Sequence, residues 1–331
     1  EALTYVERAR ARSLQDLLST SGLPQLDRSP PRDVAAILAT WPKDVVALEY
    51  YLGEDKAWVF VIDPLGCLKA FQLVDSKGRS VTPTEIVQRV RRFIQVTDHV
   101  LAKEKNRVLA LQYDHGWQQD LHDLYRILIP PEAATAIKKS KTAVIAPQHL
   151  LHYLPFAALV TEPDLQRSTS EVPRPKFLVE EGAAIIQVPS LMVWDRLRQA
   201  PAARITEVRA LGDADASGLP GVAQDFANLK EVFGTRTKVI HSSTDATVAN
   251  AKAMLGQPGL AFFGSHGQES PDRPLEGRII FEAPSPGNEK GFLTAADIYT
   301  LPVASDLVIL AACYSGRADR SPLPGDDLFG L

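Results

Sequence analysis

Residues 307–316 read Leu-Val-Ile-Leu-Ala-Ala-Cys-Tyr-Ser-Gly, an apolar run that ends in a cysteine and is followed at once by a turn. Residues 260–267 read Leu-Ala-Phe-Phe-Gly-Ser-His-Gly and have the same plan, with a histidine in place of the cysteine. Short apolar runs bounded by turn residues are typical of buried strands. The two stretches therefore predict two buried strands, each followed by a chemically reactive side chain, His266 or Cys313.

Strand and helix patterns alternate around these two stretches. Strands are expected at 208–211, 238–240, 260–263 and 306–311, a short edge strand at 278–281, and helices at 222–233, 246–255 and 294–300. Such alternation favours a mostly parallel sheet flanked by helices, an α/β fold. Parallel strands present their carboxyl ends at one edge of the sheet, where sites form. His266 and Cys313 are therefore expected at the same edge.

The first 200 residues have a different pattern. Three extended runs separated by turns, at 45–52, 58–62 and 68–74, predict an antiparallel meander. Thr82 and Glu85 predict a capping box at the start of a helix, with Pro83 in its first turn. The remaining expected elements are a helix at 118–129 that stops at Pro130, strands at 142–146 and 183–188, and a helix capped by Ser190. Residues 200–203 read Ala-Pro-Ala-Ala and indicate a boundary.

The chain begins with a predicted helix over residues 1–18. Arg8, Arg10 and Arg12 are expected to form a basic face exposed to solvent. The helix is also interpreted as the tail of a preceding helical region, and the Pro-rich residues 29–32 end this segment.

Composition excludes several classes of protein. The net charge of −4 gives no basic field for nucleic acid, and no apolar run is long enough to span a bilayer. The two cysteines, Cys67 and Cys313, form no disulfide framework, which favours a reducing, cytoplasmic setting, with Cys67 as a spectator. His149 and His152 lack a third ligand at a suitable spacing, so we expect packing roles and no metal. No cofactor is expected.

The paired cysteine and histidine predict nucleophilic catalysis. An imidazole near a thiol makes it a good nucleophile at neutral pH. His266 would deprotonate Cys313 or protonate the leaving amine, and the backbone N–H groups of Gly267 and Cys313 would form an oxyanion hole.

Several blocks resemble the CHAT domain, a caspase-like domain often found behind tetratricopeptide repeats. Its central block is similar to residues 145–159, Ile-Ala-Pro-Gln-His-Leu-Leu-His-Tyr-Leu-Pro-Phe-Ala-Ala-Leu. Further similar blocks lie at 48–55, 211–215, 263–267, 292–299 and 310–313. His266 and Cys313 are 47 residues apart (313 − 266), close to the caspase spacing of about 50. The resemblance is expected to run from about Trp41 to the end.

The resemblance implies a peptidase of the clan of caspases and separases, with His266 and Cys313 as its dyad. It divides the chain into an N-terminal helix and linker (1–40), a pseudo-caspase half (41–200) and a catalytic half (201–331). The catalytic half is expected to be truncated, cleaved or only partly ordered at its C-terminal end, residues 324–331, because family members usually continue through another helix and strand. Tyr314 departs from the family, since many members carry a charged residue there. The resemblance also implies that the loop after the strand at 208–211 contributes to the substrate pocket. Asp213 and Asp215 in this loop are interpreted either as turn caps or as an acidic pocket that prefers a basic residue.

We therefore expect a cysteine endopeptidase that cleaves a protein substrate and is activated by a partner or by a regulatory helical-repeat region. The first alternative is a catalytically silent caspase-like scaffold or peptide-binding signalling module. The second is an acyl-transfer enzyme other than a protease.

Overall fold

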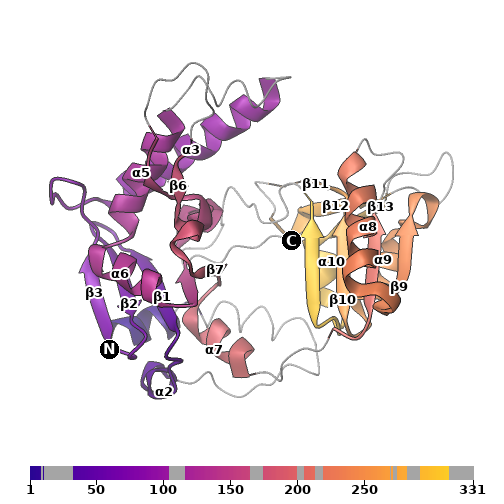
Figure 1. Cartoon of the computed structure of the whole chain (residues 1–331), viewed down its shortest axis with the longest axis horizontal. Coiled ribbons are helices and arrows are strands. Elements are labelled where there is room, and N and C mark those ends of the chain that lie inside the picture. The colour runs from indigo at the N-terminus through magenta and orange to yellow at the C-terminus, as the bar shows by residue number, and fades with distance from the viewer. Residues whose placement is uncertain are drawn as a thin grey trace. The chain divides into compact units, whose positions relative to one another are not determined.

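The computed structural model describes residues 1–8, 10, 33–103, 116–164, 174–199, 205–212, 219–268, 270, 274–281 and 291–312. These residues form two compact units, each with its own central sheet (Figure 1). Among the described residues, unit 1 extends to Gln199 and unit 2 starts at Ile205. The expected boundary at residues 200–203 lies outside the described residues. The assignment of one half as pseudo-caspase and the other as catalytic stays a prediction.

Unit 1 is built on a five-stranded sheet in the order β3-β2-β1-β4-β7. Its strands are β1 (Val45–Leu52), β2 (Ala57–Ile62), β3 (Leu68–Gln72), β4 (Thr142–Ala146) and β7 (Ala184–Gln187). The predicted meander is confirmed, because β1 pairs antiparallel with β2 and β2 with β3. β4 and β7 continue the sheet in parallel with β1. A small antiparallel pair, β5 (Val160–Glu162) and β6 (Lys176–Phe177), lies outside this sheet.

Helices cover both faces of the unit 1 sheet, because each inner strand is apolar on both sides. Alternate residues such as Leu48 and Tyr50 of β1 pack in one core with α3 (Pro83–Lys103), α5 (Gly116–Leu128) and α6 (Pro131–Lys139). The residues between them pack in a second core with helical residues 2–8, α2 (Val34–Ala39) and α7 (Leu191–Gln199). Single 3₁₀ turns occur at η1 (His149–Tyr153), η2 (Phe156–Ala158) and η3 (Leu178–Glu181).

The predicted caps at the starts of two helices are confirmed, and one helix was missed. At the start of α3, the Glu85 N–H donates to the Thr82 hydroxyl and the Thr82 N–H donates to the Glu85 carboxylate at 2.9 Å. The Ser190 hydroxyl accepts from the Val193 N–H at the start of α7. The sequence interpretation missed α6, because it took Pro130 and Pro131 only as a stop. Pro131 is also the first residue of α6, a position that needs no N–H donor.

The predicted basic, solvent-exposed face of the N-terminal helix is wrong at Arg10. This side chain is 6% exposed and forms an ion pair with the fully buried Glu49 of β1 at 3.3 Å. It also donates to the Tyr50 carbonyl at 2.7 Å. Glu49 faces the helix because it follows Val45 and Ala47 along one side of β1, and a buried carboxylate needs a counter-charge. Arg8 is exposed as expected, and Arg12 lies outside the described residues.

Unit 2 is built on a four-stranded parallel sheet in the order β14-β10-β8-β9. Its strands are β8 (Val208–Gly212), β9 (Thr237–Ser242), β10 (Leu260–Gly264) and β14 (Leu307–Ala311). α8 (Pro220–Phe233) packs on one face through Val222 and Phe226. α9 (Val248–Leu255) packs on the other face, with Ile298 of α10 (Ala295–Thr300) against the same core. The 3₁₀ turns are η4 (Gly234–Arg236), η5 (Ser243–Asp245) and η6 (Pro274–Glu276). The prediction of an α/β fold with parallel sheets flanked by helices is confirmed.

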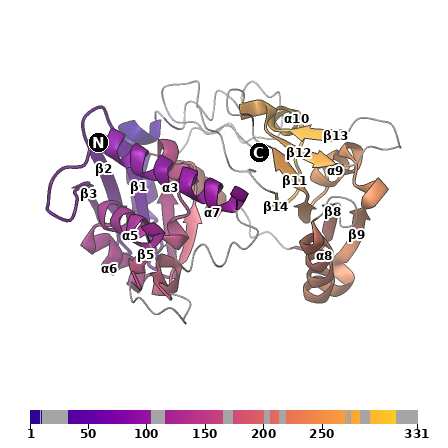
Figure 2. The same ribbon diagram turned by 90° about the horizontal axis from the view of Figure 1, so that it is seen from above.

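A second sheet of three short antiparallel strands belongs to unit 2 (Figures 1 and 2). It contains β11 (His266–Gln268), β12 (Arg278–Phe281) and β13 (Gly291–Thr294), with β12 in the centre. The prediction that residues 278–281 form an edge strand is therefore wrong. Sequence patterns do not predict β11 or β13, since these strands have only three and four residues.

Candidate active site

The candidate site lies at the carboxyl edge of the parallel sheet in unit 2. β10 and β14 are neighbouring parallel strands, and their last paired residues are Gly264 and Ala311. His266 is the second residue after Gly264, and Cys313 is the second residue after Ala311. β10 and β14 therefore end side by side at the carboxyl edge of the sheet, as the sequence predicted for these two strands. Cys313 itself lies outside the described residues.

Backbones approach closely at this edge because two glycines face each other. Gly212 is the last residue of β8 and pairs with Gly264 of β10. A Cβ atom on Gly212 would overlap the carbonyl group of Gly264, and one on Gly264 would lie 3.1 Å from Val222 of α8. Asp213 and Asp215 follow Gly212 in the chain and lie outside the described residues. The structure therefore describes the start of their loop and not their side chains.

A buried serine holds His266 in place. Ser265 is 3% exposed, and its hydroxyl donates to the Ile280 carbonyl of β12. His266 follows as the first residue of β11, opposite Ile280, and its side chain is exposed. Gly267 lies opposite Ile279 and is half-buried. The histidine therefore stands at the junction of the two sheets of unit 2, on the side open to solvent.

The residues around His266 on the three-stranded sheet were missed by sequence reasoning. Directly opposed residues share a face, so His266, Ile280 and Phe292 lie on one side. Gln268 and Arg278 lie on the same side, two residues along each strand. The opposite side is buried in the core of unit 2 through Ile279, Phe281 and Leu293. The sequence of β12, Arg-Ile-Ile-Phe, has no alternation of polar and apolar residues that would have revealed this arrangement.

The family comparison agrees with the resemblance seen in the sequence. A family model of the CHAT domain matches residues 118–331.

The chain belongs to the CHAT domain family. The match includes all described residues of unit 2 and the later part of unit 1, and it starts well after Trp41, where the resemblance was expected to begin. The family is caspase-like, which fits the parallel sheet with helices on both faces. A search of curated proteins found no match to the chain. No helix among the described residues is long and apolar enough to cross a membrane.

Two aspartates of unit 2, Asp297 and Asp306, have structural roles in this CHAT domain. The carboxylate of Asp297 accepts from the Thr294 N–H and hydroxyl at the start of α10 and from the Lys252 ammonium at 2.8 Å. Partial burial by itself would raise the pKa of Asp297, but the bonds from Lys252 and Thr294 outweigh it and hold that pKa below its usual value. Asp306 accepts from the Gly259 N–H at 2.7 Å just before β14.

The two histidines of the central CHAT block do not form a metal site among the described residues. His152 is half-buried, and its pKa is lowered to about 3 by burial, then by the nearby charges of Arg10 and His149. His152 is therefore neutral at pH 7. His149 is exposed and adopts a left-handed backbone conformation with a φ of 54°.

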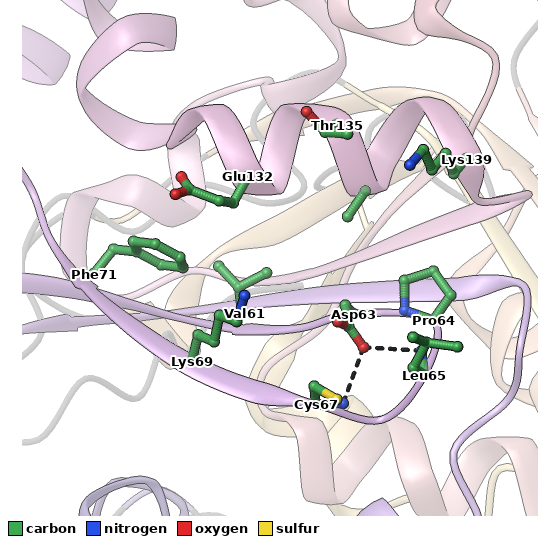
Figure 3. A pocket seen from close by; sticks show the side chains of 11 residues that line it. Val61, Asp63, Pro64, Leu65, Cys67, Lys69, Phe71, Glu132, Thr135 and Lys139 are labelled. Atoms are coloured by element: carbon green, nitrogen blue, oxygen red, sulfur yellow. Dashed lines mark hydrogen bonds between the residues drawn. The ribbon is translucent and has the colours of Figure 1, made fainter.

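Unit 1 has a pocket that contains Cys67 (Figure 3). It lies between α6 and the β2–β3 hairpin, has a volume of about 370 Å³, and is walled partly by Val61 and Phe71. The N–H of Cys67 donates to the Asp63 carboxylate, and its thiol is free and exposed. The spectator role of Cys67 stays a prediction.

Proposed function

We propose that this CHAT domain is a cysteine endopeptidase with Cys313 as its nucleophile and His266 as its acid–base partner. The observation that carries the proposal is the pairing of Gly264 with Ala311. The segments that lead to His266 and Cys313 therefore begin at adjacent positions on one edge of the sheet. Neighbouring strands lie about 4.8 Å apart, and this spacing supports the proposal that a thiol and an imidazole two residues beyond that pair act on one substrate.

The proposed reaction follows from these two groups. His266 removes the proton of the Cys313 thiol, and the thiolate attacks the carbonyl carbon of the scissile peptide bond. The N–H groups of Gly267 and Cys313 stabilise the oxyanion that forms. The imidazolium then donates its proton to the leaving amine, and a thioester remains. A water molecule, deprotonated by His266, hydrolyses the thioester and releases the new carboxylate and the free thiol.

The proposed substrate is a protein with a basic residue next to the cleaved bond. Asp213 and Asp215 follow Gly212, and Gly212 is paired with Gly264 at the same sheet edge. Carboxylates at that edge would pair with lysine or arginine and would repel an acidic residue.

We also propose that the activity is regulated through the N-terminus, by a preceding helical-repeat region or by an activating protein. The support is the set of contacts between the N-terminal helix and the rest of unit 1. The Glu7 carboxylate accepts from the N–H groups of Leu191 and Met192 at the start of α7, while Arg10 pairs with Glu49. Movement of this helix would therefore disturb its contacts with β1 and α7. A reducing compartment such as the cytoplasm would keep the Cys313 thiol free.

The test is a cleavage assay on the full chain with proteome-derived peptides that contain lysine or arginine. We expect Cys313→Ala to abolish cleavage, His266→Ala to reduce it by roughly 10²-fold or more, and Cys67→Ala to leave it unchanged. Cleavage that survives Cys313→Ala would refute the proposal. Full biological activity of the Cys313→Ala variant would instead establish the competing interpretation, a silent scaffold.

A further inference from the structure

We propose that Arg278 binds an acidic side chain of the substrate on the leaving-group side of the cleaved bond. The site consists of Arg278, Gln268 and Phe292 on the three-stranded sheet that carries His266. This inference rests on the proposed function, because it uses the role of His266 to orient the substrate.

The strand register places Arg278 close to His266. His266 is directly opposite Ile280, and Arg278 precedes Ile280 by two residues on the same face of β12. Diagonal neighbours of this kind are separated by about 7–8 Å. Because His266 protonates the leaving amine, residues that follow the cleaved bond pass over this sheet. An extended peptide advances about 3.3 Å per residue, so the second residue after the bond comes within reach of Arg278.

The guanidinium of Arg278 is already held in one position. Its centre lies 4.1 Å from the centroid of the Phe292 ring, a cation–π contact. Its Nε and Nη2 atoms donate to the Gln268 Oε1 atom at 3.0 and 2.8 Å. These two bonds use two of five N–H donors, so three donors remain for a carboxylate. A fixed guanidinium loses little conformational entropy when it binds.

The charge of Arg278 favours a carboxylate ligand. The side chain is half-buried, and no carboxylate among the described residues forms an ion pair with it. A planar guanidinium matches two carboxylate oxygens, and such charged hydrogen bonds are stronger than neutral ones. Phe292, which is 37% exposed, adds an apolar surface for the aliphatic part of a glutamate. The favoured occupant is therefore a substrate segment with glutamate at the second position after the cleaved bond.

The test compares two fluorescein-labelled hexapeptide pools with a fixed lysine at position three. Position five is glutamate in one pool and glutamine in the other. Fluorescence anisotropy on the Cys313→Ala protein should show tighter binding of the glutamate pool, by about tenfold or more. Arg278→Gln should remove that preference and Arg278→Lys should keep part of it.

Arg236→Gln is the matched control. Arg236 also stacks on a phenylalanine of unit 2, Phe233, with 5.0 Å between its guanidinium and the ring centroid, but it lies in η4, just after α8, and not on the three-stranded sheet. This variant should keep the full preference for glutamate. An unchanged preference in Arg278→Gln, or no preference in the parent protein, would overturn the inference.

Failure of this inference and failure of the proposed function give different results. If the wild-type chain cleaves both pools and Arg278→Gln keeps the same glutamate preference, only the role of Arg278 is refuted. If the wild-type chain cleaves nothing and Cys313 reacts no faster than Cys67, the protease proposal fails. The anisotropy measurement still decides on Arg278 in that case, because it needs no turnover.

Discussion

At the scale of single residues, Gly212 controls how β8 meets β10 at the candidate site. A methyl group at Gly212 would overlap the carbonyl oxygen of Gly264, which belongs to the backbone segment that leads to His266. We expect Gly212→Ala to destabilise unit 2 by about 1–3 kcal/mol, a typical overpacking cost, and to reduce any cleavage activity. Urea unfolding measures the first effect.

Gly221→Ala is the control for this change. Gly221 lies in the first turn of α8, has an ordinary backbone conformation, and leaves open space within 4 Å of the position that a methyl group would take. The substitution should be neutral or should stabilise by up to about 1 kcal/mol. Equal effects of the two substitutions would show that the close approach at Gly212 is not a constraint.

At the scale of secondary-structure elements, the buried contact between Arg10 and Glu49 holds the N-terminal helix against β1. Burial and the neighbouring Glu7 carboxylate raise the pKa of Glu49, while Arg10 acts in the opposite direction. We expect Arg10→Met to destabilise unit 1 by about 1–3 kcal/mol, because it leaves the buried Glu49 carboxyl group without its partner. Arg8→Met, on the exposed side of the same helix, should stay within about 0.5 kcal/mol in the same urea titration. Equal losses would contradict a buried ion pair.

The elements that could be predicted from sequence are those with strong local signals. β1 and β4 have the predicted bounds, because their apolar runs are flanked by clear turns. Burial of Arg10 could not be predicted, since its partner Glu49 is 39 residues away and is recognised only once the sheet forms. β11 and β13 have three and four residues, and they acquire strand geometry only by pairing with β12. The Arg278–Phe292 contact depends on that pairing and was missed for the same reason.

At the scale of the whole molecule, the chain is a CHAT domain with two α/β units. The parallel sheet of unit 2 and the shared edge of β10 and β14 could be predicted, because strand–helix alternation leaves few topologies open. The acidic pocket formed by Asp213 and Asp215 stays a prediction, since both residues lie outside the described part of the chain.

The most direct test of the dyad is site-resolved labelling of the chain with a thiol-directed peptide probe. The chain contains two cysteines, so Cys67 is an internal standard. Mass spectrometry should find that Cys313 reacts roughly tenfold or more faster than Cys67, since a nearby histidine raises the thiolate fraction. His266→Ala should remove that difference, and Cys313→Ala should leave only the slow reaction. Equal rates at the two cysteines in the wild-type chain, or a fast rate at Cys313 that survives His266→Ala, would contradict a dyad of Cys313 and His266.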